Sequence, residues 1–160
     1  MSRNPTTIPR AFFNGAAQFG MCACGVYIIP EAGHAFEIYW NGGPGTNNRA
    51  EVMALAGLIS FYIFLDLKNV QIYGDSKLII DHILLKHKIK NIHLEGWLNR
   101  TAALWNSRRD YSITHINRDL NNKVDELSKM GLLPHKKFGE MQIKTDNLSY
   151  QIQNFCPPGT

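Results

Sequence analysis

Three acidic residues of this 160-residue chain lie where a carboxylate is costly or well placed for chemistry. Glu51 lies in a strongly apolar stretch, where a charge is unfavourable unless it is paired or bound to a metal. Asp75 follows a short β-prone run, and the carboxyl end of a strand is the usual ligand position in an open α/β sheet. Asp125 interrupts the apolar stripe of a predicted helix. If these carboxylates converge on one rim, they suit a hard divalent cation such as Mg²⁺, which prefers oxygen ligands.

Each of these carboxylates also has a purely structural explanation. Asp75 could cap a helix beginning at Ser76, and Glu51 could offset the dipole at a helix N-terminus. Asp125 could form a surface ion pair with Lys129, four residues further along the same helix. For any one residue alone the structural explanation is favoured, whereas the three together favour a metal site.

The elements that must position these residues follow from hydrophobic periodicity and turn signals. Short β-prone runs joined by tight turns predict three antiparallel strands at residues 10–18, 21–29 and 34–40. Helix-capping residues and apolar spacing predict a long helix from Thr46 or Asn47 to about residue 64. The remaining predicted elements are a strand at 69–73, a helix from 76, a helix over about 93–106, a strand at 111–116 and a helix at 121–130. This order predicts an α/β fold whose five-stranded mixed sheet carries helices on both faces.

The length and composition indicate one globular domain. Apolar residues make up 44% of the chain and charged residues 19%, a balance that excludes a disordered or collagen-like protein. We expect a flexible arm over residues 1–10, a domain over 11–133 and a tail over 134–160, because few apolar residues recur at either period after Pro134. The longest apolar stretch, residues 54–65, is too short to span a membrane, so no membrane association is expected.

Charge and cysteine usage say less about function. The formal net charge of +4 is compatible with a polyanionic partner but does not establish one. Three cysteines are too few for a disulfide framework, which predicts a reducing, intracellular compartment, nuclear or cytoplasmic.

Three motifs together resemble ribonuclease H of type 1, above all the domains of plant LINE-type retroelements and of the archaeal-like branch. They are Thr-Asn-Asn-Arg-Ala-Glu ending at Glu51, Gly-Asp-Ser around Asp75, and Arg118 followed by Asn121 and Asp125 at the family's spacing. The resemblance covers about residues 11–133. It implies a ribonuclease H-like fold that cleaves the RNA strand of RNA/DNA hybrids with two Mg²⁺ ions, or with Mn²⁺ in their place.

The resemblance implies four catalytic metal ligands, and one of them differs here. Glu51, Asp75 and Asp125 match three of the family's carboxylates. The fourth belongs to the first strand, in an Asp-Gly motif that reads Asn14-Gly15 in this chain. Asparagine offers a neutral carbonyl oxygen where the family has an anionic ligand, so we expect lower metal affinity and slow cleavage. Whether Asn14 is natural or was introduced to trap a substrate complex stays open.

The resemblance also implies residues that contact substrate. Arg118 is the candidate to meet the scissile phosphate, with a surface ion pair as its alternative. Further candidates are expected near bases, sugars or 2′-hydroxyls, although helix capping and tight packing explain several of them equally well. They are Gly15, Ala16, Asn47, Asn48, Ser76 and Asn121. The basic segment that contains Lys86, Lys88 and Lys90 could bind phosphates or could form an ordinary solvated turn.

Two functions of different classes therefore remain. The first is an endonuclease for RNA/DNA hybrids, impaired by Asn14, and the second is a catalytically inactive module that binds hybrids in the same groove. A nuclease or integrase of another kind would need a second carboxylate where Ala16 stands. We expect a monomeric domain, within a larger retroelement polyprotein that also contains a reverse transcriptase.

Overall fold

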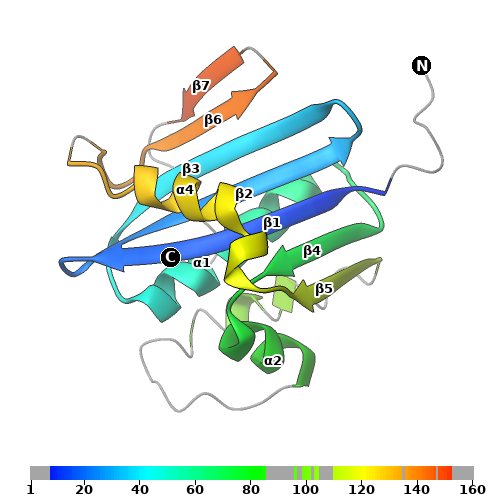
Figure 1. Ribbon diagram of the computed structural model, residues 1–160, viewed down its shortest axis with the longest axis horizontal. Helices are drawn as coiled ribbons and strands as arrows, with labels where there is room; N and C mark the ends of the chain where they lie inside the picture. The colour runs from blue at the N-terminus through cyan, green and yellow to red at the C-terminus, as the bar shows by residue number, and fades with distance from the viewer. Residues whose placement is uncertain are drawn as a thin grey trace.

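Seven strands form one mixed sheet in the computed structural model, which describes residues 8–85, 96, 99–101, 103–104, 110–134, 136–146 and 148–152. The strand order is β5-β4-β1-β2-β3-β6-β7 (Figure 1). The strands are β1 (Arg10–Gln18), β2 (Met21–Glu31), β3 (His34–Pro44), β4 (Val70–Gly74), β5 (Tyr111–His115), β6 (Met141–Thr145) and β7 (Leu148–Ile152).

Strand β1 is the strand on which the site is built, and its neighbours run in opposite directions. It pairs antiparallel with β2 along its whole length, and β2 pairs antiparallel with β3, as the tight turns predicted. On its other side β1 pairs parallel with β4, and β4 pairs parallel with β5. The carboxyl ends of β1 and β4 therefore open at the same edge of the sheet.

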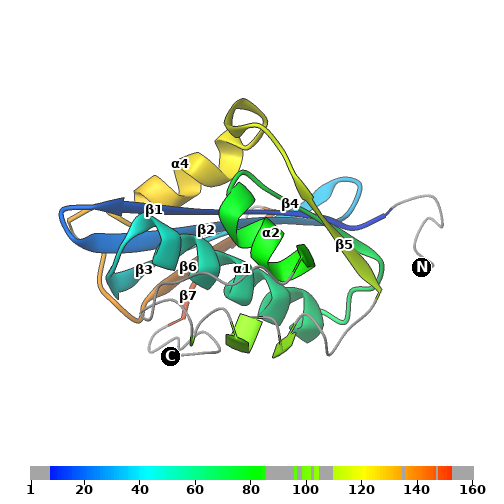
Figure 2. The same cartoon turned by 90° about the horizontal axis from the view of Figure 1, so that it is seen from below.

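Helices cover both faces of the sheet (Figure 2). The helix α1 (Asn47–Phe64) and the helix α2 (Lys77–Leu85) lie on one face, whereas α4 (Asn122–Met130) crosses the other after the short 3-10 helix η1 (Arg118–Leu120). Residues 96, 99–101 and 103–104 are also helical, and the rest of the helix predicted over 93–106 lies outside the described residues. None of the described helices has the length and hydrophobicity needed to cross a bilayer.

The helix α1 forms the centre of the core because its sequence is apolar on nearly every side. Thr46 caps it, since the Thr46 hydroxyl accepts a hydrogen bond from the Arg49 backbone N–H at 3.2 Å. Leu55, Leu58 and Ile59 are fully buried against the sheet. This packing fixes the N-terminal turns of α1, which carry Glu51, against β1.

On the opposite face, α4 approaches β2 closely at Gly25. A Cβ atom at Gly25 would lie 2.6 Å from the carbonyl oxygen of Val124 and 2.7 Å from the backbone nitrogen of Ser128. Only glycine leaves room for this contact. The close approach brings Asp125 of α4 beside β1.

The predicted count of five strands is wrong, because residues 141–152 add β6 and β7 to the edge of the sheet beyond β3. These residues belong to the segment expected to be a tail. These two strands bury few of their described side chains, Met141 completely and Ile143 in part, both in β6, so their hydrophobic pattern is weak. The signal that was missed is the Asp146-Asn147 pair between two short β-prone runs, where Asp146 has a φ of 53°.

Candidate active site

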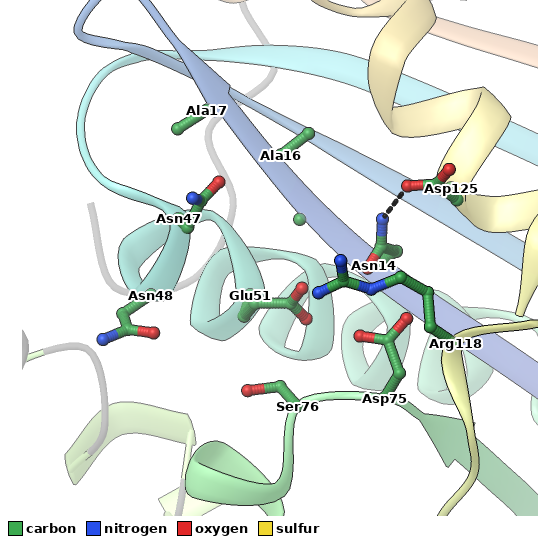
Figure 3. Close-up of a pocket in the computed structure, with 11 residues that line it drawn as sticks. Asn14, Ala16, Ala17, Asn47, Asn48, Glu51, Asp75, Ser76, Arg118 and Asp125 are labelled. Atoms are coloured by element: carbon green, nitrogen blue, oxygen red, sulfur yellow. Dashed lines mark hydrogen bonds between the residues drawn. The ribbon is translucent and has the colours of Figure 1, made fainter.

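A pocket of about 270 Å³ opens at the edge of the sheet where β1 and β4 end. Four parts of the chain line it: the second half of β1, the start of α1, the residues directly after β4, and the segment from η1 to α4. The lining residues are Asn14, Gly15, Ala16, Ala17, Asn47, Asn48, Glu51, Asp75, Ser76, Arg118 and Asp125. The side chains of Asn14, Glu51, Asp75 and Asp125 gather around one opening, toward which Arg118 also extends (Figure 3).

Glu51 reaches this opening because β1 and α1 are in backbone contact at Gly15. A Cβ atom at Gly15 would lie only 2.3 Å from the carbonyl carbon of Ala50 and 2.3 Å from the nitrogen of Glu51. The Gly15 backbone also donates a hydrogen bond to the Glu51 carboxylate. Gly15 is therefore required by packing, whatever it contributes to substrate binding.

The Glu51 carboxyl is the most strongly perturbed acid around the pocket. Its pKa is raised from 4.5 to about 8, and burial is the largest cause. The negative charges of Asp75 and Asp125 also raise it, whereas the Gly15 hydrogen bond and Arg118 act in the opposite direction. Its Oε2 atom is buried without a hydrogen-bond partner among the described residues. A cation bound here would stabilise the ionised form of Glu51, because the buried Oε2 atom lacks a hydrogen bond and lies near two other carboxylates.

We expect the stability of the metal-free chain to fall as the pH rises from 4.5 to 8. In that interval folded Glu51 retains a proton that the unfolded chain has lost, so folding is favoured at the acidic end. One such proton gives a slope of up to about 1.4 kcal/mol per pH unit. Denaturant unfolding in the presence of a chelator measures this slope, and Glu51→Gln should flatten it. An identical slope in the Glu51→Gln variant would contradict the assignment.

Asn14 and Asp125 contact each other directly. The Asn14 side-chain amide donates to Asp125 Oδ1 at 3.3 Å and to Ser128 Oγ at 3.0 Å, and Asn14 is only 4% exposed. The other oxygen of Asp125 pairs with Lys129 Nζ at 2.9 Å, as the structural explanation for Asp125 expected. Asp125 thus both forms the surface pair and lines the pocket.

Asp75 is hydrogen-bonded to the buried side chain of Asn121. The Asn121 amide donates to Asp75 Oδ2 at 3.2 Å and to the carbonyl oxygen of Phe13 at 3.1 Å. Asn121 is 1% exposed, so it lies beneath the pocket and not on its substrate-facing surface.

The donor set fits a divalent cation in its chemistry. Glu51, Asp75 and Asp125 offer carboxylate oxygens, and Asn14 could add a carbonyl oxygen if its amide turned. In the described part of the chain, no three His, Cys, Asp or Glu side chains are arranged to hold one metal ion as they stand. The Asn14 amide and Lys129 engage the two carboxylate oxygens of Asp125, so a metal ion would compete with both partners for this carboxylate.

The remaining candidate residues differ in accessibility. Asn47, Asn48 and Arg118 are exposed at the rim, and Ser76 is half-buried. The three predicted phosphate-binding residues Lys86, Lys88 and Lys90 lie outside the described residues.

The sequence interpretation missed Ser128 as a partner of Asn14 and Ala17 as a lining residue. The signal for Ser128 was its position three residues after Asp125 on the same helix.

Comparisons with known proteins bear on the family and the fold of this chain. A sequence profile described as reverse transcriptase-like matches residues 16–131. No curated protein shows significant sequence similarity to the chain. The profile match over residues 16–131 covers most of the described sheet and every carboxylate of the pocket.

Solved structures of ribonuclease H proteins share the fold. RNase H1 from Halobacterium salinarum is 26% identical with a TM-score of 0.71, covering 78% of this chain and 96% of that one. LC11 RNase H1, isolated from compost and solved with an RNA/DNA hybrid, is 26% identical with a TM-score of 0.67, covering 76% and 94%. The N-terminal RNase H domain of a Mycobacterium tuberculosis protein is 20% identical with a TM-score of 0.72, covering 79% and 94%. These similarities confirm the expected mixed α/β, ribonuclease H-like fold.

Proposed function

The chain belongs to the reverse transcriptase-like family, and from that premise we propose that its pocket binds RNA/DNA hybrids and hydrolyses the RNA strand. The observation that carries the proposal is the convergence of Glu51, Asp75 and Asp125 from three separate elements on one open pocket. A fold of type 1 ribonuclease H supports a nuclease, and one structural relative was solved with a hybrid bound.

The carboxylates would hold Mg²⁺, or Mn²⁺ in its place. A pair of such ions would supply a hydroxide from water and would stabilise the leaving 3′-oxygen of the RNA strand. Glu51 must lose its proton to bind a cation, and the cation must compete with the Asn14 amide for Asp125 Oδ1. Both requirements weaken metal binding in this chain, so we propose that hydrolysis by the Asn14 form is slow.

The rim of the pocket would bind the nucleic acid. Asn47 and Asn48, at the exposed start of α1, face the opening with amides that suit base or sugar edges. The backbone of Gly15 and Ala16 would lie near RNA 2′-hydroxyls, which distinguish RNA from DNA without reading base identity. Lys86, Lys88 and Lys90 would add sequence-independent phosphate contacts.

An inactive hybrid-binding module is the alternative, and the hydrogen bond between Asn14 and Asp125 is the observation that favours it. In this arrangement the amide replaces the repulsion of two neighbouring carboxylates with an attraction. Such a pocket keeps its shape without a metal ion. The same rim residues would then bind a hybrid that is released uncut.

We further propose that the domain acts as a monomer within a larger retroelement polyprotein that includes a reverse transcriptase. The family description supports this context. A reducing, intracellular compartment fits it, because Cys22 and Cys24 are buried free thiols.

Arg118 offers a test of the proposed reaction. Arg118 is exposed, and its guanidinium extends into the pocket near Glu51 and Asp75, where it would bind the scissile phosphate (Figure 3). In a chain that also carries Asn14→Asp, we expect Arg118→Ala to slow Mg²⁺-dependent cleavage of a labelled hybrid by about 10- to 100-fold. Arg10→Ala, an exposed arginine at the far end of β1, is the matched control. Equal rates for Arg118→Ala and Arg10→Ala would remove Arg118 from the reaction.

A further inference from the structure

Asn121 occupies the N-cap position of α4 but does not cap the helix. Asparagine is among the preferred N-cap residues because its side-chain oxygen accepts a hydrogen bond from a free backbone N–H of the first turn. Here the Asn121 side chain makes no capping hydrogen bond, and its Oδ1 atom is buried without a partner among the described residues. The first turn of α4 therefore lacks the capping hydrogen bond that the Asn121 side chain could supply.

The amide of Asn121 is directed instead at two acceptors from other elements. Its Nδ2 atom donates to the Phe13 carbonyl oxygen at 3.1 Å and to Asp75 Oδ2 at 3.2 Å. The orientation of the amide is determined by its partners, because a carbonyl and a carboxylate only accept hydrogen bonds. If the amide were flipped, its oxygen would face both of them.

These two hydrogen bonds join three parts of the chain at the base of the pocket. Phe13 lies in β1 directly opposite Gly74, the residue before Asp75. Asn121 lies four residues before Asp125 and precedes the helix that carries it. One buried side chain thus links the strand of Asn14, the loop of Asp75 and the helix of Asp125.

We propose that Asn121 is a positioning residue that orients the Asp75 carboxylate for a divalent cation. The inference rests on the proposed metal-dependent function. The hydrogen bond to Oδ2 restricts rotation of the Asp75 carboxylate and leaves Oδ1 as the oxygen available to the pocket. Residues that hydrogen-bond to metal-binding carboxylates in this way tune the affinity for the metal.

The experiment compares variants of Asn121 in the full chain carrying Asn14→Asp. Asn121→Ala removes the amide. Asn121→Ser retains a good N-cap residue but is too short to reach both acceptors, so it separates helix capping from the orientation of Asp75. Asn122→Ala, an exposed asparagine at the next position, is the matched control. Mg²⁺ affinity is measured by calorimetry without nucleic acid, and hybrid affinity is measured in a chelator.

We expect both Asn121 variants to bind Mg²⁺ about 10- to 100-fold more weakly than the Asn122→Ala control, with unchanged affinity for hybrid in the chelator. Mg²⁺ affinities equal to that of the control, whatever the stability of the variants, would overturn the proposal. A loss confined to hybrid affinity would overturn it as well, because Asn121 would then be a substrate contact. Absence of cleavage by the Asn14→Asp form would count against the proposed function alone, since the calorimetry still decides the role of Asn121.

Discussion

Replacing Asn14 with aspartate should accelerate Mg²⁺-dependent cleavage of RNA/DNA hybrid by at least about 100-fold, because a change at a direct metal ligand should exceed the effect of outer-shell changes. The substitution adds an anionic ligand between Asp75 and Asp125. It also removes the amide that hydrogen-bonds to Asp125 Oδ1. Initial rates on a hybrid with a labelled RNA strand, at saturating Mg²⁺, measure the gain.

Asn14→Ala separates these two contributions. It frees Asp125 from the amide but supplies no carboxylate, so we expect it to cleave no faster than the Asn14 chain. A gain in Asn14→Ala equal to that in Asn14→Asp would mean that the amide, and not the missing charge, limits the reaction. Equal rates for the Asn14 and Asn14→Asp chains would refute the prediction.

Gly15→Ala should abolish most of the activity of the Asn14→Asp form and also destabilise the fold. The added methyl group would lie 2.3 Å from backbone atoms of Ala50 and Glu51, and backbone atoms cannot move aside as a flexible side chain can. Forcing α1 away from β1 should cost about 1–3 kcal/mol of unfolding free energy. Displacing Glu51 by about 1 Å should slow cleavage by about 100-fold.

Gly96→Ala is the control for this prediction, because a Cβ atom at Gly96 would have no neighbour within 4 Å among the described residues. Gly96 is helical, so alanine there should leave stability unchanged or increase it. Denaturant unfolding and cleavage rates are measured on both variants. Wild-type stability in Gly15→Ala would show that α1 does not pack on β1 as the structure has it.

The parts of the fold that position the site could be predicted because their signals are local. Tight turns between β-prone runs indicated β1 to β3, and the Thr46 cap marked the start of α1. Glu51 was recognised because a carboxylate amid apolar residues needs a partner, and its raised pKa reflects that burial. The strands β6 and β7 were missed because they bury few side chains and because β6 joins the sheet by pairing with β3, a contact distant in sequence, while β7 pairs with β6 alone.

The role of Asn121 could not be read from the sequence for a related reason. An asparagine at the start of a predicted helix is sufficiently explained by capping. That its side chain turns away from the helix depends on Phe13 and Asp75, which are distant in sequence and meet only when β1 and β4 pair. The same limit applies to Asn14, since its hydrogen bonds to Asp125 and Ser128 arise only when α4 packs on the sheet at Gly25.

The most direct test of the account is a paired binding and cleavage assay on the chain and its Asn14→Asp variant. The substrate is an RNA/DNA hybrid with both strands labelled, and a DNA duplex of the same sequence serves as competitor. We predict that both chains bind the hybrid in preference to the duplex, and that only the Asn14→Asp variant cleaves it rapidly, in the RNA strand alone. Intact RNA with the Asn14→Asp variant, together with no preference of either chain for the hybrid, would contradict the account.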